Sequence, residues 1–209
     1  MRVFRRKDRI YRLPRRWSNA ELRKFAHWFT GDIINVSAWQ DEDKEGGFYR
    51  DYFTNANSYR ISNHLTEVRG YQGYENEILL NLEEELPREL RGRFDVVFNH
   101  TTLEHIYNFQ LAFHNLCLLS RDIVIVVVPF LQEMHAGAYG DYWRFSPQAL
   151  EKMFARENFD LLHLAFNNQK NTSVYVFALA ARDPDRWSSR FDRNRLQLNP
   201  DVPVGSNVY

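Results

Sequence analysis

Short apolar runs recur along the chain, with polar or helix-like segments between them. Five of these runs lie at residues 32–38, 58–63, 77–82, 94–99 and 122–128. Runs of this length, bounded by polar residues, predict β-strands. The last run is β-branched and apolar at consecutive positions, so it predicts a central parallel strand that is buried on both faces.

Three segments have the spacing of helices. Ile106, Phe109, Phe113, Leu116 and Cys117 recur at helical intervals and predict a crossover helix. Ser146-Pro147 predicts the start of another, with serine as N-cap and proline in the first turn. Near the N-terminus, Ser18-Asn-Ala-Glu21 matches a capping box and predicts a helix from Ser18 to about Gly31.

Two further apolar runs, Leu161–Phe166 and Val174–Ala181, are joined by the polar loop 167–171. A loop of this length and composition predicts an antiparallel hairpin. Strands that alternate with helices and end in such a hairpin indicate an α/β fold. We therefore expect a doubly wound, mostly parallel sheet with a C-terminal antiparallel hairpin strand.

The 209 residues and their 44% apolar content suit one large domain. The 27 basic and 27 acidic residues balance, but residues 1–24 carry ten Arg or Lys against Asp8 and Glu21. We expect a basic arm at 1–17, the domain at 18–183 and an extended tail at 184–209. The arm suits an anionic partner or a membrane surface; the alternative is an arm that is solvated or folded onto the acidic body.

Other features of the sequence limit the partners and the compartment. The single cysteine, Cys117, excludes an internal disulfide and suits a reducing compartment. No apolar run approaches the length of a membrane span, and no signal peptide is recognisable, so we expect a cytoplasmic protein. No motif indicates specific nucleic-acid binding. Whether the chain forms a homo-oligomer stays open.

Polar and aromatic residues follow nearly every predicted strand. Ligands of open parallel sheets bind beyond the carboxyl ends of the strands. The segments at these positions are 37–40, 63–64, 81–82, 99–105 and 129–145. Because all of them lie at the same end of the strands, they predict a binding site along this edge of the sheet.

Two of these segments carry a family resemblance. Phe94-Asp-Val-Val-Phe-Asn-His-Thr-Thr-Leu-Glu-His105 and the later block Asp141-Tyr-Trp-Arg-Phe-Ser-Pro147 resemble class I S-adenosylmethionine-dependent methyltransferases, especially the small-molecule and glycan branch. The resemblance covers about residues 31–182. It implies a Rossmann-like fold, S-adenosylmethionine as cofactor and methyl transfer to a small molecule or a glycan precursor, with O-methylation and polysaccharide biosynthesis as the expected context.

The resemblance also implies a cofactor role for particular positions. It places Ser37, Ala38 and Trp39 under the methionine part of the cofactor, Asn63 at the ribose, Asn81 and Leu82 at the adenine, and Asn99 and His100 at the sulfonium.

The chain departs from the family pattern in its first motif. An acidic residue and a run of glycines are usual there, whereas residues 35–47 contain glycine only at Gly46 and Gly47. Both expected carboxylates are asparagines, Asn63 and Asn81, and each hydrogen bond without charge assistance is weaker by about 1 kcal/mol. The alternative function is therefore a non-catalytic module of this fold that binds a glycan or a partner protein.

Three histidines are candidate catalytic groups, since a histidine near neutral pKa suits the deprotonation of a hydroxyl acceptor. His135, in the loop after the most apolar strand, is the first choice and His105 the second. His100 is the third, with packing against the cofactor as its alternative role. The alternative for His105 is a structural hydrogen bond that ties a helix start to the sheet.

The residues Tyr139, Asp141, Tyr142 and Arg144 are candidates for substrate binding. Aromatic faces and a carboxylate suit a sugar, and Arg144 suits an anionic group on the acceptor. The equal alternative is an internal Asp141–Arg144 pair that braces the loop.

We expect no metal site. The spacing of His100 and His105 does not match a zinc-protease helix. Residues 41–45 lack the pattern of a calcium loop, and we expect them to form a solvated acidic turn.

Overall fold

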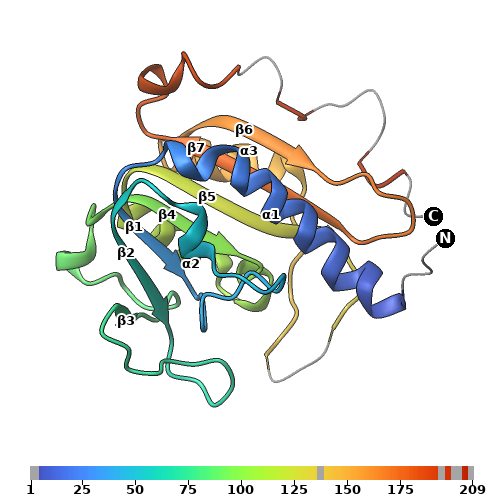
Figure 1. Cartoon of the computed structure of the whole chain (residues 1–209), viewed down its shortest axis with the longest axis horizontal. Helices are drawn as coiled ribbons and strands as arrows, with labels where there is room; N and C mark the ends of the chain where they lie inside the picture. Colours follow the sequence, from blue (N-terminus) through green and yellow to red (C-terminus); the bar gives the residue numbers. More distant parts are fainter. Residues whose placement is uncertain (1–4, 136–138, 193–195, 199–203, 207–209) are drawn as a thin grey trace.

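The computed structural model describes residues 5–135, 139–192, 196–198 and 204–206. Its centre is one seven-stranded sheet with the strand order β3-β2-β1-β4-β5-β7-β6 (Figure 1). The first five strands are parallel, whereas β7 runs antiparallel to both β5 and β6. The strands are β1 (Gly31–Val36), β2 (Ala56–Asn63), β3 (Glu77–Leu79), β4 (Phe94–His100), β5 (Ser120–Leu131), β6 (Asp160–Phe166) and β7 (Val174–Ala181). The predicted α/β sheet with a C-terminal hairpin is confirmed.

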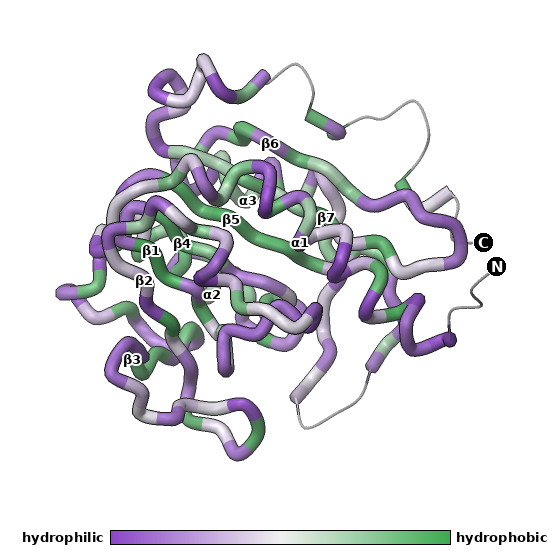
Figure 2. The backbone as a smooth tube through the Cα atoms, in the orientation of Figure 1, coloured by the Kyte–Doolittle hydropathy of each residue, from purple (hydrophilic) through white to green (hydrophobic). Residues whose placement is uncertain are grey.

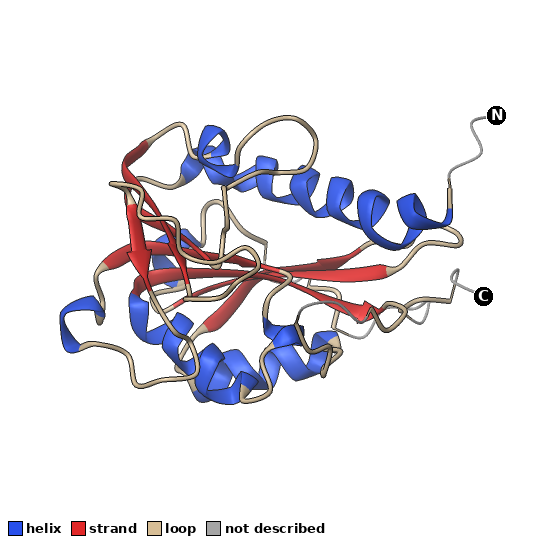
Figure 3. Ribbon diagram, turned by 90° about the horizontal axis from the view of Figure 1, so that it is seen from below, coloured by secondary structure: helices blue, strands red, loops and turns tan. Residues whose placement is uncertain are grey.

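Strand β5 is internal, as predicted, and separates two apolar layers. Ile123, Ile125 and Val127 pack on the side of helix α1 (Leu13–Phe25). The alternate residues, Val124 and Val126 among them, pack against α2 (Phe109–Leu119) and α3 (Pro147–Arg156). Figure 3 shows helices on both faces of the sheet, and Figure 2 shows the middle of β5 as hydrophobic. Alternation of side chains along an extended strand produces both layers from one apolar run.

The caps of the two later helices follow from local sequence. Ser146 is the N-cap of α3, and its Oγ accepts a hydrogen bond of 3.1 Å from the backbone N–H of Ala149. Pro147 follows in the first turn. Asn108 caps α2 in the same way and accepts from the Leu111 amide. The predicted start of α3 is thus confirmed.

The first half of the sheet lacks the helices that an alternating βα pattern predicts. Residues 31–100, all of which the structure describes, contain no α-helix. Short 3₁₀ turns occur there instead, at Tyr49–Tyr52 (η3) and Arg88–Leu90 (η4). Among the described helices, none is long and apolar enough to cross a membrane.

The predicted capping box at Ser18 is wrong. A π-helical turn, η1 (Asp8–Arg12), leads directly into α1, so the helix begins within the segment expected to be an arm. Ser18 lies inside α1, where its Oγ donates to the carbonyl oxygen of Arg15 over 2.9 Å. Burial of Leu13 against the body of the protein, at 7% exposure, outweighs the local capping signal.

The described part of the C-terminal segment packs on the body rather than extending from it. It begins with η6 (Asp185–Trp187), and the rings of Trp187 and Phe191 are buried. Trp187 meets Phe29 with ring centroids 5.3 Å apart, and Phe191 meets Phe25 at 5.1 Å. The segment thus completes the apolar layer on the α1 side of the sheet.

Candidate active site at the carboxyl ends of the strands

The loop after β5 returns across the end of β4 and is fixed there by backbone hydrogen bonds. The amides of Tyr142 and Trp143 both donate to the carbonyl oxygen of Glu104, over 2.8 and 3.3 Å. The Phe145 amide donates to the carbonyl oxygen of Pro129. Glu104 belongs to η5 (Leu103–His105), the 3₁₀ turn after β4. The two loops that carry the candidate histidines are therefore held side by side.

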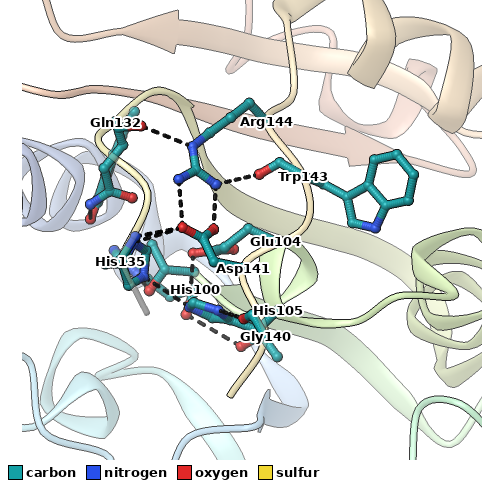
Figure 4. A network of polar contacts seen from close by, with 12 residues as sticks. His100, Glu104, His105, Gln132, His135, Gly140, Asp141, Trp143 and Arg144 are labelled. Atoms are coloured by element: carbon teal, nitrogen blue, oxygen red, sulfur yellow. Dashed lines mark hydrogen bonds and ion pairs between the residues drawn. The ribbon is translucent and has the colours of Figure 1, made fainter. Parts of the chain in front are cut away.

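His105 and His135 face each other across these loops (Figure 4). Their Nε2 atoms are 3.2 Å apart. The Nδ1 of His105 lies 2.6 Å from the Gly140 carbonyl oxygen, which can only accept, so this nitrogen carries a proton. In the neutral ring Nε2 of His105 is then an acceptor. Burial lowers the pKa of His105, and the neighbouring His135 lowers it further, which favours the neutral ring.

Asp141 orients His135. The backbone N–H of His135 donates to Asp141 Oδ2 over 2.7 Å, and its ring Nδ1 lies 3.3 Å from the same oxygen. The Asp141 side chain is fully shielded from solvent. Burial alone would raise the pKa of Asp141, but hydrogen bonds from Arg144 and the His135 amide lower it to about 2. Asp141 is therefore a fixed negative charge beside the histidine pair.

Arg144 braces this loop. Its guanidinium has five N–H groups, and five hydrogen bonds leave it. Two go to the Asp141 carboxylate and the others to the carbonyl oxygens of Gln132, Glu133 and Trp143. These contacts match the bracing alternative, because every donor is already used within the loop.

The two candidate tyrosines lie on the outer side of this cluster. The ring of Tyr139 is 5.5 Å from that of His105. Tyr142 is half exposed and meets the more exposed Tyr107 with ring centroids 5.5 Å apart. Tyr139 thus contacts the histidine pair, and Tyr107 and Tyr142 form a separate exposed pair on the same two loops.

Glu104 is a site residue that the sequence reasoning missed. Its side chain is fully buried, and Oε1 lies 3.8 Å from His105 Nε2. Its Oε2 has no hydrogen-bond partner among the described residues. Burial raises the pKa of Glu104 to about 8 against the lowering effects of its backbone hydrogen bond and of Arg144. The only signal in the sequence was its place between Leu103 and His105, in a turn after an apolar strand.

The loop after β1 has the backbone form of a glycine-rich loop without its glycines. Ser37, Trp39 and Asp41 all have positive φ, at 59°, 53° and 62°. Side chains in this left-handed region are strained by about 1–2 kcal/mol each. The Ala38 amide donates to the Ser62 carbonyl oxygen, which holds the loop beside the end of β2.

The side chain of Asn63 is hydrogen-bonded to this loop. Its Oδ1 accepts from the Trp39 amide over 2.6 Å, and its Nδ2 donates to the Trp39 carbonyl oxygen and to Glu77. Asn81, expected at the adenine, forms a local turn by accepting from the Glu83 amide, and Leu82 is buried in the core. The structure does not bring Asn81 together with the histidine pair by any contact.

Asn99 and His100 end β4. The Asn99 Nδ2 donates to the Val36 carbonyl oxygen over 2.9 Å. His100 turns toward α1, where its Nε2 lies 2.8 Å from Ser18 Oγ. Ser18 donates its proton to the Arg15 carbonyl, so His100 Nε2–H is the donor to Ser18. Burial and the charge of Arg15 lower the pKa of His100 well below its ordinary value. The neutral His100 ring therefore links β4 to α1 by a hydrogen bond.

The acidic segment 41–45 is not the solvated turn that its composition predicts. Asp41 and Asp43 are 4% and 2% exposed. Asp43 accepts from the amides of Glu45 and Gly47 and from the Tyr52 hydroxyl. Arg23 of α1 also pairs with Asp43, so local partners together with a distant one hold a carboxylate that looks solvated in sequence.

A separate hollow of about 120 Å³ lies at the opposite edge of the sheet. Gly31, Asp95, Asp122 and Trp187 are among its lining residues, and they stand near the amino-terminal ends of β1, β4 and β5 or in η6. It is therefore distinct from the histidine cluster at the carboxyl ends.

No family model and no curated protein matches this sequence. Solved structures do match its fold. Magnesium protoporphyrin IX methyltransferase from Synechocystis PCC 6803, with bound S-adenosylhomocysteine, has a TM-score of 0.58 at 9% identity, over 88% of this chain and 90% of that one. A putative methyltransferase from Bacillus halodurans C-125 has a TM-score of 0.55 at 12% identity, over 78% and 97%.

A third match widens the range of chemistry seen on this fold. The [4+2]-cyclase SpnF has a TM-score of 0.58 at 11% identity and covers 80% of each chain. At these identities the likeness concerns architecture alone. The strand order, the antiparallel C-terminal strands and these matches together show that the chain has a Rossmann-like methyltransferase fold.

Proposed function

We propose that this chain is an S-adenosylmethionine-dependent methyltransferase that acts on a hydroxyl group of a small molecule. The observation that carries the proposal is the pairing of His105 and His135, 3.2 Å apart, at the carboxyl ends of β4 and β5. Ligands of open α/β sheets bind at this edge. Neighbours of the same fold are described with S-adenosylmethionine or its demethylated product bound.

The residues around the end of β1 fit such a cofactor in part. In the loop at residues 37–41, Ser37, Trp39 and Asp41 adopt the positive φ that the glycines of such a loop usually adopt. Ser62 and Asn99 pair with Val36 from either side, and within the described ranges Ser62 Oγ and Asn99 Oδ1 are buried without a partner. Unsatisfied buried oxygens are costly, so they favour a ligand that brings hydrogen-bond donors to this point.

The cofactor would supply an electrophilic methyl group, and the chain's own residues would prepare the acceptor. With its Nδ1–H directed at Asp141, the neutral ring of His135 keeps an unprotonated Nε2, which can take the proton of a hydroxyl. Asp141, 3.3 Å from His135 Nδ1, stabilises the positive charge that this transfer leaves on the imidazole. Arg144 keeps Asp141 in place, so its role is to position the base.

A sugar or glycan precursor is our proposed acceptor class. Tyr107 and Tyr142 present exposed aromatic faces beside the site, and such faces suit the apolar side of a sugar ring. We place the activity in polysaccharide biosynthesis in the cytoplasm, in line with the single, buried Cys117. The exposed cations Arg5, Arg6 and Lys7 remain the proposed contact for an anionic partner or membrane surface.

Thermal unfolding tests cofactor binding. S-adenosylmethionine at a hundredfold excess over its Kd should stabilise the native state by about 2.7 kcal/mol, seen as a higher Tm. His135→Asn should then cut turnover about 10²-fold or more and leave this shift unchanged, because the base acts on the acceptor. His114→Asn is the control, since His114 pairs with Glu157 away from the cluster. Full turnover by His135→Asn would remove His135 from the mechanism.

One observation favours a second candidate, a non-catalytic binding module of the same fold. Both N–H groups of the Asn63 side chain are used by Trp39 and Glu77, so it has none left to donate to a ribose. This candidate predicts no rise in Tm with S-adenosylmethionine or S-adenosylhomocysteine. A rise with either ligand excludes it in this form.

A further inference from the structure

Three potential metal ligands from two different loops converge in this structure. They are His105 from η5 and His135 and Asp141 from the loop after β5. One nitrogen of each imidazole and one carboxylate oxygen all lie within 4.8 Å of one another. The cluster is partly buried, so an ion there would be shielded yet reachable from solvent.

We propose that His105, His135 and Asp141 bind a divalent transition-metal ion of the zinc class. Two imidazoles and a carboxylate are donors that zinc and its neighbours in the first transition row accept. With metal–nitrogen bonds of about 2.0–2.1 Å, two nitrogens on a tetrahedral ion lie about 3.3 Å apart. The Nε2 atoms of His105 and His135 are 3.2 Å apart.

Hydrogen bonds with neighbouring groups already hold two of the proposed ligands in place. Metal-bound histidines usually donate their other ring N–H to a carbonyl or carboxylate, which fixes the ring. The Nδ1 of His105 does so to Gly140 over 2.6 Å. Asp141 is held by Arg144 and by the His135 amide. His105 and Asp141 are thus oriented before any ion arrives.

Glu104 supplies an independent observation that points to a cation. Its carboxyl group is fully buried, Oε1 lies 3.8 Å from His105 Nε2, and Oε2 lacks a hydrogen-bond partner within the described part of the chain. A cation at the histidine pair would lie beside this buried carboxyl group and give it a partner.

A shared proton would join the two Nε2 atoms by one hydrogen bond at this distance, whereas a metal ion would accept a lone pair from both. The inference does not rest on methyl transfer, and an ion bound to these Nε2 atoms would occupy the lone pair that the proposed base uses. If the protein binds the cofactor normally but binds no metal ion, the metal-site proposal is wrong and the proposed function still stands.

Cobalt provides the direct test, because Co²⁺ bound to nitrogen and oxygen ligands absorbs visible light. The full chain, treated with a chelator and then titrated with Co²⁺, should gain this absorption at one equivalent and lose it when Zn²⁺ is added. His105→Asn and His135→Asn should each weaken Co²⁺ binding by about 100-fold or more, since even the loss of an outer contact costs about 10–100-fold. His114→Asn, with His114 on α2, should bind as the unaltered chain does.

Two outcomes would overturn the proposal. One is the absence of visible absorption at stoichiometric Co²⁺; the other is equal Co²⁺ affinity in the unaltered chain and the folded His105→Asn variant, which would mean adventitious binding only. Should a variant not fold, imidazole NMR signals of the unaltered chain decide the matter. Zn²⁺ should shift those of His105 and His135, and shifts confined to the other histidines would contradict the site.

Discussion

Asp141 and Arg144 form an ion pair whose two sides differ in burial. The Asp141 side chain is completely shielded, and that of Arg144 is 24% exposed. Arg144→Met should lower the free energy of unfolding by about 3 kcal/mol, because it leaves a buried carboxylate without its main partner. Urea denaturation measures this change. Arg6→Met, which breaks the exposed pair with Glu133, should cost less than about 1 kcal/mol.

The effect of Arg144→Met should also depend on pH. An unfolded aspartate has a pKa of about 4. In the folded protein the pKa of Asp141 is about 2, so the pair contributes its full stability above about pH 4 and loses it as the pH falls toward 2. The difference between the unaltered chain and Arg144→Met should therefore shrink below about pH 4. A difference that stays constant down to pH 2 would show that Asp141 is not the group that Arg144 stabilises.

Single residues were the hardest part of the site to predict. His105 and His135 were chosen because they follow strands, and the structure brings them into contact. Their tautomers depend on Gly140 and Asp141, which no sequence pattern places. Glu104 was missed because its side chain is buried by packing between two loops, which cannot be predicted from the neighbouring residues in the sequence.

At the scale of elements, the loop after β1 stores backbone strain that can be measured. Ser37 has a φ of 59°, which glycine adopts without penalty. Ser37→Gly should raise the free energy of unfolding by up to about 1 kcal/mol. Ala38→Gly is the matched control: Ala38 has no positive φ, so the change should destabilise by about 0.5–1 kcal/mol. Equal effects of both substitutions on urea denaturation would show that the loop is not strained at Ser37.

Helix α1 illustrates how a correct local motif can mislead. A serine followed three residues later by glutamate is typical of a helix start, yet Ser18 contacts His100 from within α1. Glu21 pairs with His163 and Lys24 instead of with the backbone. The start of the helix is set by contacts with distant residues, and a local motif cannot include those.

The N-terminal turn of α1 should therefore belong to the stable body. Leu13→Ala should lower the free energy of unfolding by about 2 kcal/mol or more, since it empties a buried position. Arg12→Ala, at the preceding and exposed position, should change it by less than about 0.5 kcal/mol. Deletion of residues 1–16 also removes Arg15, which donates to Tyr49 and Thr101. A deleted chain that melts at the unaltered temperature would contradict this assignment.

For the whole molecule, apolar patterning predicted the sheet well, because burial on one or both faces dictates it. The run at 122–128 became the internal strand β5, and the two last runs paired as a hairpin. Patterning did not predict the segment after β7. There the aromatic rings of Trp187 and Phe191 are isolated among polar residues, so no period marks them as core.

Because this C-terminal segment completes the apolar layer on the α1 side, its loss should lower the free energy of unfolding of the entire fold. The Trp187 ring meets that of Phe29 edge-on, and its Nε1 donates to Asp122 Oδ2 over 3.2 Å at the beginning of β5. Trp187→Ala should therefore lower the free energy of unfolding by about 3–5 kcal/mol through the cavity and the lost hydrogen bond. Ser189→Ala, at an exposed position two residues later, should change it by less than about 0.5 kcal/mol. The transition should remain a single cooperative step in urea, because α1, β5 and η6 share one apolar layer. A Trp187→Ala variant as stable as the unaltered chain would mean that the segment lies on the body without supporting it.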